Sequence, residues 1–224
     1  MNEAKQLAAD VYPKVFRTDF SQQGFTLINQ GSDYGSERQR QFMVELKGEF
    51  DQLEQKHRGR HLVYQSLGRF DQQVTTKPHR DGGPEESILI LGYEPTMIES
   101  RVSLSDYSLC AREMGLTPFE FLDQYNPLFA DGQERLAKYS TAVTDFDNTC
   151  FQVLIINNSL TSVGENRLLG VLHTAEIINP DSGFMRVVNS TMIASESEYS
   201  DGGISANEKR AFVFTDIVRR ASNG

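Results

Sequence analysis

The sequence predicts one α+β domain over residues 1–224, mainly β, in which an antiparallel sandwich or barrel is flanked by helices. Residues 61–102 and 146–218 are rich in β-branched and aromatic residues between Gly and Pro, which is typical of strands. Residues 1–60 and 103–145 have the spacing of helices instead. Because strands and helices occupy separate blocks, an antiparallel sheet is favoured over a doubly wound parallel one.

The N-terminal block is expected to provide helical support for the sheet. The segment "NEAKQLAADVYPKVF" predicts a short helix. A longer helix is expected after Ser36, which forms a capping-box pattern with Gln39. Four apolar residues then recur at steps of three and four: Phe42, Leu46, Phe50 and Leu53. Gly59 is expected to end this helix, and the long helix should pack on an apolar surface.

Three strand candidates follow the N-terminal helices, namely "HLVYQSLGRF", "QQVTTKPH" and "SILILGYEP". Four more follow the second helical block: "CFQVLIINNS", "RLLGVLHTAEII", "GFMRVVNSTMIA" and "RAFVFTDIV". Turn residues such as "NPDSG" separate them, as expected for hairpin-like connections.

The block between the two sets of strands predicts a helical insertion. Its first helix, "SLSDYSLCAREMG", is expected to end on Gly115. Its second begins with Thr117 as N-cap and Glu120 at the third helical position. Asp131 with Glu134 opens a third helix through "RLAKYSTAV". The insertion either forms a lid or substrate wall, or it simply packs on the surface, and the sequence favours neither.

Composition narrows the class of partner. The net charge is −9 and the sequence pI is near 5.0, so nucleic acid is not an expected partner. The basic cluster "KHRGRH" is explained by cations that favour a helix C-terminus. No signal-peptide pattern or long apolar run occurs, and Cys110 and Cys150 lack CxxC spacing. We therefore expect a cytoplasmic protein with free thiols and no membrane contact; its oligomeric state is not predicted.

The segment "TTKPHRDGGP" offers candidate catalytic or metal-ligating residues. His79-Arg80-Asp81 resembles a protein-kinase catalytic loop only superficially, because Glu86 stands where that loop needs Asn and no DFG follows. A second interpretation is structural, since chance readily gives a His-x-Asp in a chain with 31 acidic residues. A third is a metal site, because residues i and i+2 of an extended segment point to the same side.

A metal site needs a further ligand, and His173 is the best candidate. It lies inside the apolar segment "LLGVLHTAEII", where an imidazole must be either hydrogen-bonded or bound to an ion. Arg186 follows in another apolar segment, where its guanidinium requires an anion. That anion is either a protein carboxylate or a bound one. Two histidines and a carboxylate with open positions are typical of non-haem Fe(II) oxygenases.

The ordered set His79, Asp81, His173 and Arg186 resembles the Fe(II)/2-oxoglutarate-dependent dioxygenases of the double-stranded β-helix, or jelly-roll, fold. The resemblance covers roughly residues 62–194. It implies that the two histidines and the Asp hold Fe(II), and that 2-oxoglutarate chelates the ion and is bound through its far carboxylate by Arg186. Ser190 is expected to add a hydrogen bond to that carboxylate.

The implied reaction consumes O2, releases succinate and CO2, and hydroxylates a small-molecule or amino-acid-like substrate. One departure from the family is Phe70, which stands where a Tyr often donates to the cosubstrate. Two alternatives stay open. One is a cupin-like metal enzyme of another reaction type, although Asp81 stands where cupins need a second His. The other is a non-catalytic jelly-roll binding protein in which the polar cluster is structural.

Overall fold

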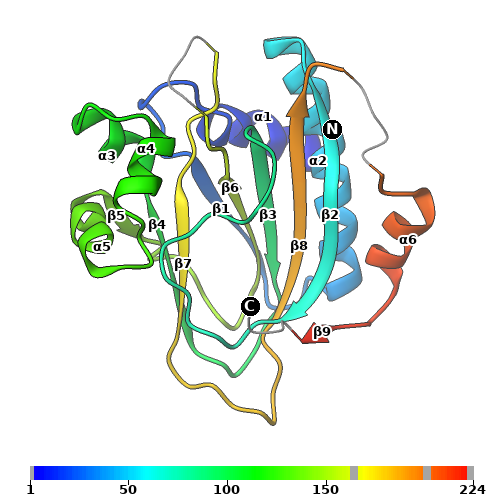
Figure 1. Ribbon diagram of the computed structural model, residues 1–224. Helices are drawn as coiled ribbons and strands as arrows, with labels where there is room; N and C mark the ends of the chain where they lie inside the picture. The colour runs from blue at the N-terminus through cyan, green and yellow to red at the C-terminus, as the bar shows by residue number, and fades with distance from the viewer. Residues whose placement is uncertain (1–2, 162–165, 199–202, 221–224) are drawn as a thin grey trace.

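Two β sheets lie against each other in the computed structural model, and helices α1 and α2 cover the outer face of the larger sheet (Figure 1). The structure describes residues 3–161, 166–198 and 203–220. Within these ranges the α-helices are α1 (Glu3–Val15), α2 (Ser36–Arg58), α3 (Tyr107–Glu113), α4 (Pro118–Gln124), α5 (Ala130–Leu136) and α6 (Ala206–Phe214). The strands are β1 (Phe25–Gly31), β2 (His61–Asp71), β3 (Ser87–Tyr93), β4 (Ser100–Ser105), β5 (Ser140–Ala142), β6 (Phe151–Asn157), β7 (Leu172–Ile177), β8 (Val187–Glu196) and β9 (Arg219–Arg220).

The larger sheet has the strand order β1-β6-β3-β8-β2-β9, and the smaller one has the order β5-β4-β7. Every described strand pair is antiparallel except that of the two-residue strand β9, which runs parallel to β2. The predicted α+β class with antiparallel sheets is therefore confirmed. The two sheets do not close into a barrel within the described ranges, and the jelly-roll topology stays a prediction.

Strand β3 shows how the two layers share one sheet. All seven of its residues are buried, with Ile88 and Ile90 in the core beneath the helices and Leu89 and Leu91 in the core between the sheets. Successive side chains of a strand point to opposite faces, so one apolar run supplies both cores. This explains why "SILILGY" reads as continuously apolar rather than alternating.

Helix α2 ends as predicted but begins differently. Gly59 has a left-handed backbone, φ 65°, and its N–H donates to the carbonyl of Gln55, which confirms the Gly cap. The expected capping box of Ser36 with Gln39 is wrong, because Gly35 is the N-cap and no side chain caps the helix. Ser36 instead donates to Glu94, and Gln39 is buried and donates to main-chain carbonyls of the larger sheet. The two side chains therefore hydrogen-bond to distant parts of the fold instead of to the N-terminus of their own helix.

The segment "RAFVFTDIV" is a helix for most of its length, so the predicted strand is wrong there. Helix α6 begins at a capping box of Ser205 with Glu208, and it buries Phe212 and Val213 against the core under the larger sheet. Apolar residues in a short run fit a strand and one face of a helix equally well, and the cap decides between them.

Three further boundaries differ from the predictions. The N-terminal block contains strand β1, which pairs with β6, in addition to its two helices. The helical insertion starts and ends in strands, since 103–105 belong to β4 and 140–142 form β5. The segment "QQVTTKPH" is a loop apart from one bridge at His79. Short strands are stabilised mainly by their partners, which a single segment does not reveal.

In the part of the chain that the structure describes, no helix has the length and apolarity needed to cross a membrane. Cys110 is buried and Cys150 is half-buried, and both are free thiols as predicted.

The core beneath the helices should dominate stability, because Phe50 of α2 is fully buried there and packs against Phe16 at a centroid distance of 5.3 Å. We expect Phe50→Ala to lower the free energy of unfolding by about 3–5 kcal/mol. Urea denaturation followed by circular dichroism measures it. Gln52→Ala, at an exposed position of the same helix, is the matched control and should stay within about 0.5 kcal/mol of the wild type. Equal effects of the two substitutions would contradict this packing.

Candidate metal centre

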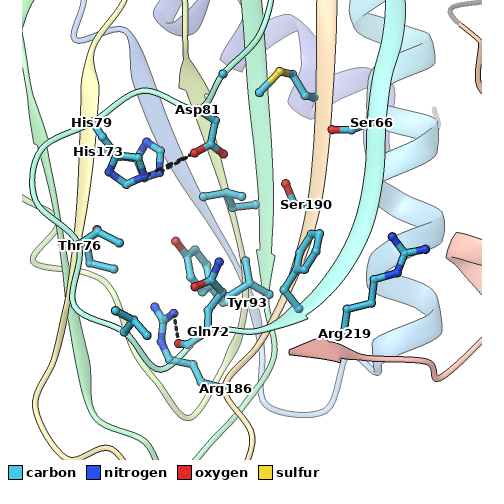
Figure 2. Close-up of a pocket in the computed structure, with 17 residues that line it drawn as sticks. Ser66, Gln72, Thr76, His79, Asp81, Tyr93, His173, Arg186, Ser190 and Arg219 are labelled. Atoms are coloured by element: carbon cyan, nitrogen blue, oxygen red, sulfur yellow. Dashed lines mark hydrogen bonds and ion pairs between the residues drawn. The ribbon is translucent and has the colours of Figure 1, made fainter. Parts of the chain in front are cut away.

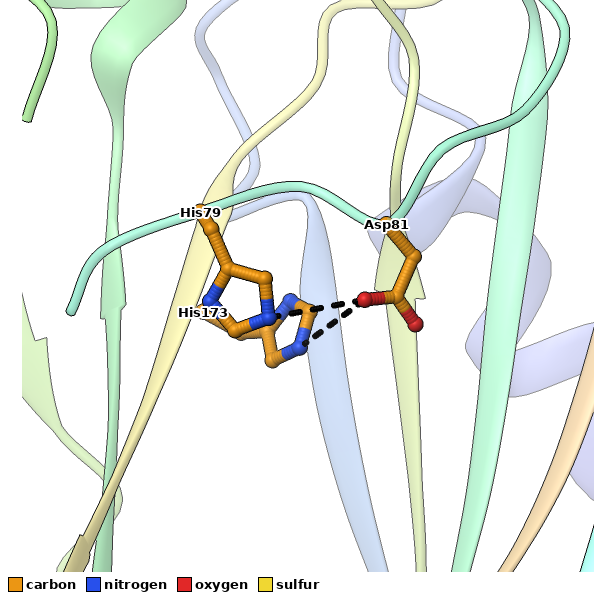
Figure 3. Close-up of side chains that lie close together, drawn as sticks. All are labelled: His79, Asp81 and His173. Carbon is orange, nitrogen blue, oxygen red and sulfur yellow. Dashed lines mark ion pairs between the residues drawn. The ribbon is translucent and has the colours of Figure 1, made fainter. Parts of the chain in front are cut away.

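Two histidines face each other across a short backbone ladder. The N–H of His79 donates to the carbonyl of His173 over 3.1 Å, and the N–H of His173 donates to the carbonyl of His79 over 2.8 Å. Residues that exchange both bonds lie directly opposite, with side chains on the same face. Their ring centroids are 4.1 Å apart. The pairing brings a loop after β2 against strand β7 and places both imidazoles in one cavity (Figure 3).

Asp81 completes a cluster with the two rings. Its Oδ1 lies 3.4 Å from Nε2 of His79 and 3.8 Å from Nε2 of His173. One ligand atom from each residue lies within 4.8 Å of the other two. Donors about 2.0–2.2 Å from one ion and about 90° apart would be about 3 Å from each other. Rotations of a few side-chain torsions therefore suffice to bring all three onto one ion, and the donor set fits a divalent transition metal.

The orientation of His79 suits metal binding. Its Nδ1 lies 2.8 Å from the carbonyl oxygen of Lys77. A carbonyl only accepts, so in the neutral ring Nδ1 carries the proton and Nε2 presents its lone pair to the cluster. His173 is 8% exposed, and its Nδ1 has no hydrogen-bond partner among the described residues. Its Nε2 is the nitrogen that faces Asp81 (Figure 3).

Asn158 holds the backbone of Asp81 from the end of β6. Its Oδ1 accepts from the N–H of Asp81 over 2.9 Å, and its Nδ2 donates to the carbonyl of Asp81 over 3.0 Å. The Asn158 side chain is itself buried and also donates to Ser87. Arg80 turns away from the cavity and donates to main-chain carbonyls, including that of Asn158. Asn158 is a residue that sequence reasoning missed, because a lone Asn after a strand gives no signal.

The cluster perturbs the pKa of each member. Burial, followed by the charge of His79, lowers the pKa of His173 to about 4. For Asp81, burial acts to raise the pKa, but the hydrogen bond to His79 and the charges of the two imidazoles outweigh it and the pKa is lowered. For His79, burial acts to lower the pKa, but the hydrogen bonds with Asp81 and Lys77 outweigh it and the pKa is raised. A carboxylate and a neutral His173 are the forms that bind metals.

The three residues lie at one end of a cavity of about 550 Å³. Such a volume is in the range of about 300–1,000 Å³ that is common for small-molecule sites. Arg186 lies at the other end, and Tyr93 lies between (Figure 2). The described lining residues are Ser66, Phe70, Gln72, Val74, Thr76, His79, Asp81, Gly82, Leu91, Tyr93, His173, Ala175, Arg186, Val188, Ser190, Met192 and Arg219.

Arg186 is a buried cation, 3% exposed, and its side chain forms no ion pair with the residues that the structure describes. Its Nε donates to the hydroxyl of Ser100 over 2.9 Å and its Nη1 to the carbonyl of Gln72 over 3.1 Å. The guanidinium lies 5.1 Å from the ring centre of Tyr93. Its Nη2 has no partner, and no carboxylate pairs with it in the described parts of the chain. The side-chain salt bridge considered from the sequence is therefore not formed with a described residue. A nearby charge is that of Asp71, whose carboxylate accepts from the backbone N–H of Arg186 over 3.0 Å; burial lowers the pKa of Arg186, and the charge of Asp71 acts in the opposite direction.

Two other sequence expectations concern this cavity. Ser190 lines it from β8, between Gly68 and Leu91 of the neighbouring strands. Phe70 lines it as well, and Tyr93 supplies a phenol that sequence reasoning missed. Burial raises the pKa of Tyr93, so its hydroxyl keeps its proton. Alternation along β3 could have revealed it, because Tyr93 continues the face of Leu91.

The helical insertion does not line the cavity. Residues 103–145 are all described, and none of them borders it. Helices α3 to α5 pack in a core of their own on the smaller sheet, with Tyr107, Phe121 and Leu172 at its centre. Of the two roles left open by the sequence, surface packing is the one that this arrangement fits.

No family model matches this chain, and no curated protein shows significant similarity to it.

The two hydrogen bonds between the Asn158 side chain and the backbone of Asp81 should affect the affinity for a metal ion. We expect Asn158→Ala to weaken Mn(II) binding about 10- to 100-fold, because residues that orient a ligand contribute this much to metal sites. Isothermal titration calorimetry measures it. Asn126→Ala, in the helical insertion, is the control and should bind as the wild type does. Unchanged affinity in Asn158→Ala would mean that Asp81 is not a ligand or is oriented without these hydrogen bonds.

The cluster also generates a prediction for the metal-free protein. Two of the interactions that raise the pKa of His79, a hydrogen bond and a charge, come from Asp81. Asp81→Asn removes the charge, so the folded-state pKa of His79 should fall and the neutral ring should persist to lower pH. NMR titration of the imidazole protons in EDTA measures this. A pKa of His79 that stays or rises in Asp81→Asn would contradict the geometry of the cluster.

Proposed function

We propose that the protein is a Fe(II)/2-oxoglutarate-dependent oxygenase that hydroxylates a small organic substrate. The observation that carries the proposal is the buried, unpaired guanidinium of Arg186 in the same cavity as the His79–Asp81–His173 cluster. A metal alone would explain the cluster but not the cation. A diacid that reaches from the ion to Arg186 accounts for both.

The donor set supports iron with an open coordination sphere. Two imidazoles and one carboxylate, without thiolates, suit Fe(II) and leave positions for further ligands. Asp81 neutralises only one of the two charges of the ion, so an anionic chelator is favoured in the open positions. The carboxylate and keto oxygens of 2-oxoglutarate would provide such a chelate.

Arg186 would bind the far carboxylate of 2-oxoglutarate. Two of its nitrogens are fixed by Ser100 and Gln72, so the guanidinium is already oriented and Nη2 is left for an anion. A planar guanidinium binds a carboxylate through charge-assisted bonds. Ser190 and Tyr93 border the same cavity, and their hydroxyls could donate hydrogen bonds to the cosubstrate. They would replace the hydrogen bond that Phe70, which has no hydroxyl, is unable to donate.

Bound Fe(II) would supply the redox chemistry in which 2-oxoglutarate, O2 and a C–H bond give succinate, CO2 and an alcohol. The chain's own residues would hold the reactants and limit water. Leu91, Val188 and Met192 form an apolar part of the cavity wall and would limit access of water to the reactants, which would favour hydroxylation of the substrate over side reactions. The jelly-roll topology is part of the same proposal.

The two alternative functions explain less of the cavity. A cupin-like enzyme needs a ligand pattern in which Asp81 replaces a His, and it gives no role to Arg186. If the protein only binds a ligand without catalysis, there is no reason for a possible metal-binding cluster and a buried arginine to lie in the same cavity. Both alternatives are outcomes of the experiment below.

The test is anaerobic titration with Fe(II) and 2-oxoglutarate. We expect a visible metal-to-ligand charge-transfer band in the wild type, and release of succinate when air is admitted. Asp81→Ala should lose the band. Arg186→Gln should weaken 2-oxoglutarate binding about 10- to 100-fold, as expected when a charged hydrogen-bond donor is lost.

Arg101→Gln is the matched control, because this arginine is exposed on β4 and does not border the cavity. It should behave as the wild type does. If the wild type binds metal but not 2-oxoglutarate, a metal enzyme of another type is favoured. If it binds neither, or if Asp81→Ala behaves as the wild type does, the oxygenase proposal is wrong.

A further inference from the structure

We infer that the substrate of this cavity is a small organic anion, a carboxylic acid with a short apolar chain, whose carboxylate is bound by Arg219. The inference rests on the proposed function, because it concerns the part of the cavity that 2-oxoglutarate would not fill. It is carried by the position of Arg219, by its lack of a counter-ion and by the charge balance of the lining.

The position of Arg219 follows from strand register. Strand β9 pairs in parallel with the edge strand β2, and Phe70 is the partner of Arg219. Paired residues project from the same face of a sheet, and Phe70 lines the cavity. Arg219 borders the cavity at its β2 edge, and it also borders a second hollow between β2 and α6. In Figure 2 its side chain lies beside β2, on the opposite side of that strand from His79 and His173. Arg219 is exposed, so its guanidinium is accessible to a ligand from solvent.

The segment that carries Arg219 is anchored to the body of the protein. Asp216 forms ion pairs with Arg40 and Arg69, at 3.6 Å and 3.4 Å. The Nε of Arg40 also donates to the carbonyl of Val213 at the end of α6. Arg40 is almost fully buried, so these contacts fix the start of the segment on α2 and β2. Arg219 follows three residues after Asp216 on this segment.

Arg219 has no counter-ion of its own. Within the described residues it takes part in no ion pair or hydrogen bond of its side chain, in contrast to Arg40 and Arg69. An arginine held at a cavity edge without a partner is suited to a ligand carboxylate, which it can bind through two parallel bonds.

Charge balance shows which substrates would be accepted. Of the described residues that line the cavity, Asp81 is the single carboxylate, while Arg186 and Arg219 are cations. Asp81 and a 2-oxoglutarate dianion would together balance a divalent ion and Arg186. Arg219 is then the charge that remains uncompensated. An ammonium substrate would find no carboxylate left, and it would be repelled by Arg219.

The positive charge of the cavity lining contrasts with the negative net charge of the protein. The chain has a net charge of −9, whereas the described residues that line the cavity include two arginines and one carboxylate. A cavity of one sign concentrates ligands of the opposite sign. The wall beside Arg219 is apolar, since Phe70 pairs with Val188 and both line the cavity. An apolar chain on these side chains would extend from the carboxylate at Arg219 toward the ion.

A matched set of probes tests the inference by charge. Hexanoate, hexanamide and hexylamine share one carbon chain and differ in charge, and the acids from butyrate to octanoate vary the length. Each is added to protein loaded with Mn(II) and saturating 2-oxoglutarate, and the paramagnetic relaxation of its protons is measured by NMR. We expect hexanoate to bind at least about 10-fold more tightly than hexanamide, and hexylamine not to bind. Relaxation by Mn(II) also identifies the site, because Arg219 borders a second hollow between β2 and α6 that lies outside the metal cavity.

Variants separate the two arginines. Arg219→Gln should weaken hexanoate binding about 10-fold or more and leave the affinity for 2-oxoglutarate unchanged. Arg186→Gln should weaken 2-oxoglutarate binding and leave the affinity for hexanoate unchanged. Arg219→Lys keeps the charge and should retain most of the hexanoate binding. Arg210→Gln is the control, because this arginine is exposed on α6 and borders neither hollow. Circular dichroism confirms that each variant is folded.

The outcomes distinguish this inference from the proposed function. If the wild type does not bind 2-oxoglutarate, the proposed function fails. The same probes are then compared on metal-free protein by saturation-transfer NMR. A preference for carboxylates that is lost in Arg219→Gln would still support the inference. If 2-oxoglutarate binds but amides bind as tightly as acids, the inference alone is overturned. The same holds if no acid from butyrate to octanoate binds, if Arg219→Gln retains the binding, or if bound hexanoate shows no relaxation by Mn(II).

Discussion

The backbone ladder between His79 and His173 is the constraint on which the candidate site depends. Two hydrogen bonds fix a loop after β2 against β7, and they align two imidazoles that are far apart in the chain. Asp81 follows the ladder by two residues and is held in turn by the side chain of Asn158. Main-chain pairing therefore brings the three side chains together without needing a contact to an ion. Such preorganisation lowers the free energy that metal binding must spend on ordering the ligands.

A second constraint is the placement of positive charge in an acidic protein. Arg186 is buried with an unsatisfied Nη2, which is unfavourable unless an anion is bound. The other buried arginines among the described residues are neutralised, as Arg17 is by Asp106 and Arg40 is by Glu94. The contrast singles out Arg186 and, at the edge of the cavity, Arg219. A cluster that could hold a metal ion, and two arginines without ion pairs among the described residues, therefore border one cavity.

Elements that are defined by interactions between residues close in sequence were predicted correctly, whereas elements that depend on distant partners were not. The strands β2, β3, β6 and β8, the Gly59 cap and the capping box at Thr117 were predicted, because their signals lie within a few residues. Strand β1 and the strands at both ends of the helical insertion were missed. These short strands are defined by partners elsewhere in the chain. Helix α6 was taken for a strand because its short apolar run satisfies both periods.

The sequence by itself determined the chemical types at the site: two imidazoles and a carboxylate, and an arginine in an apolar segment. It also predicted that His79 and Asp81 point to the same side, because alternation along an extended segment is a local property. Only the tertiary structure decided that the Arg186 side chain forms no ion pair with a described residue, that Asn158 holds Asp81, and that Arg219 borders the same cavity. Those facts depend on which segments meet in space, and pairing between distant segments is a property of the whole fold.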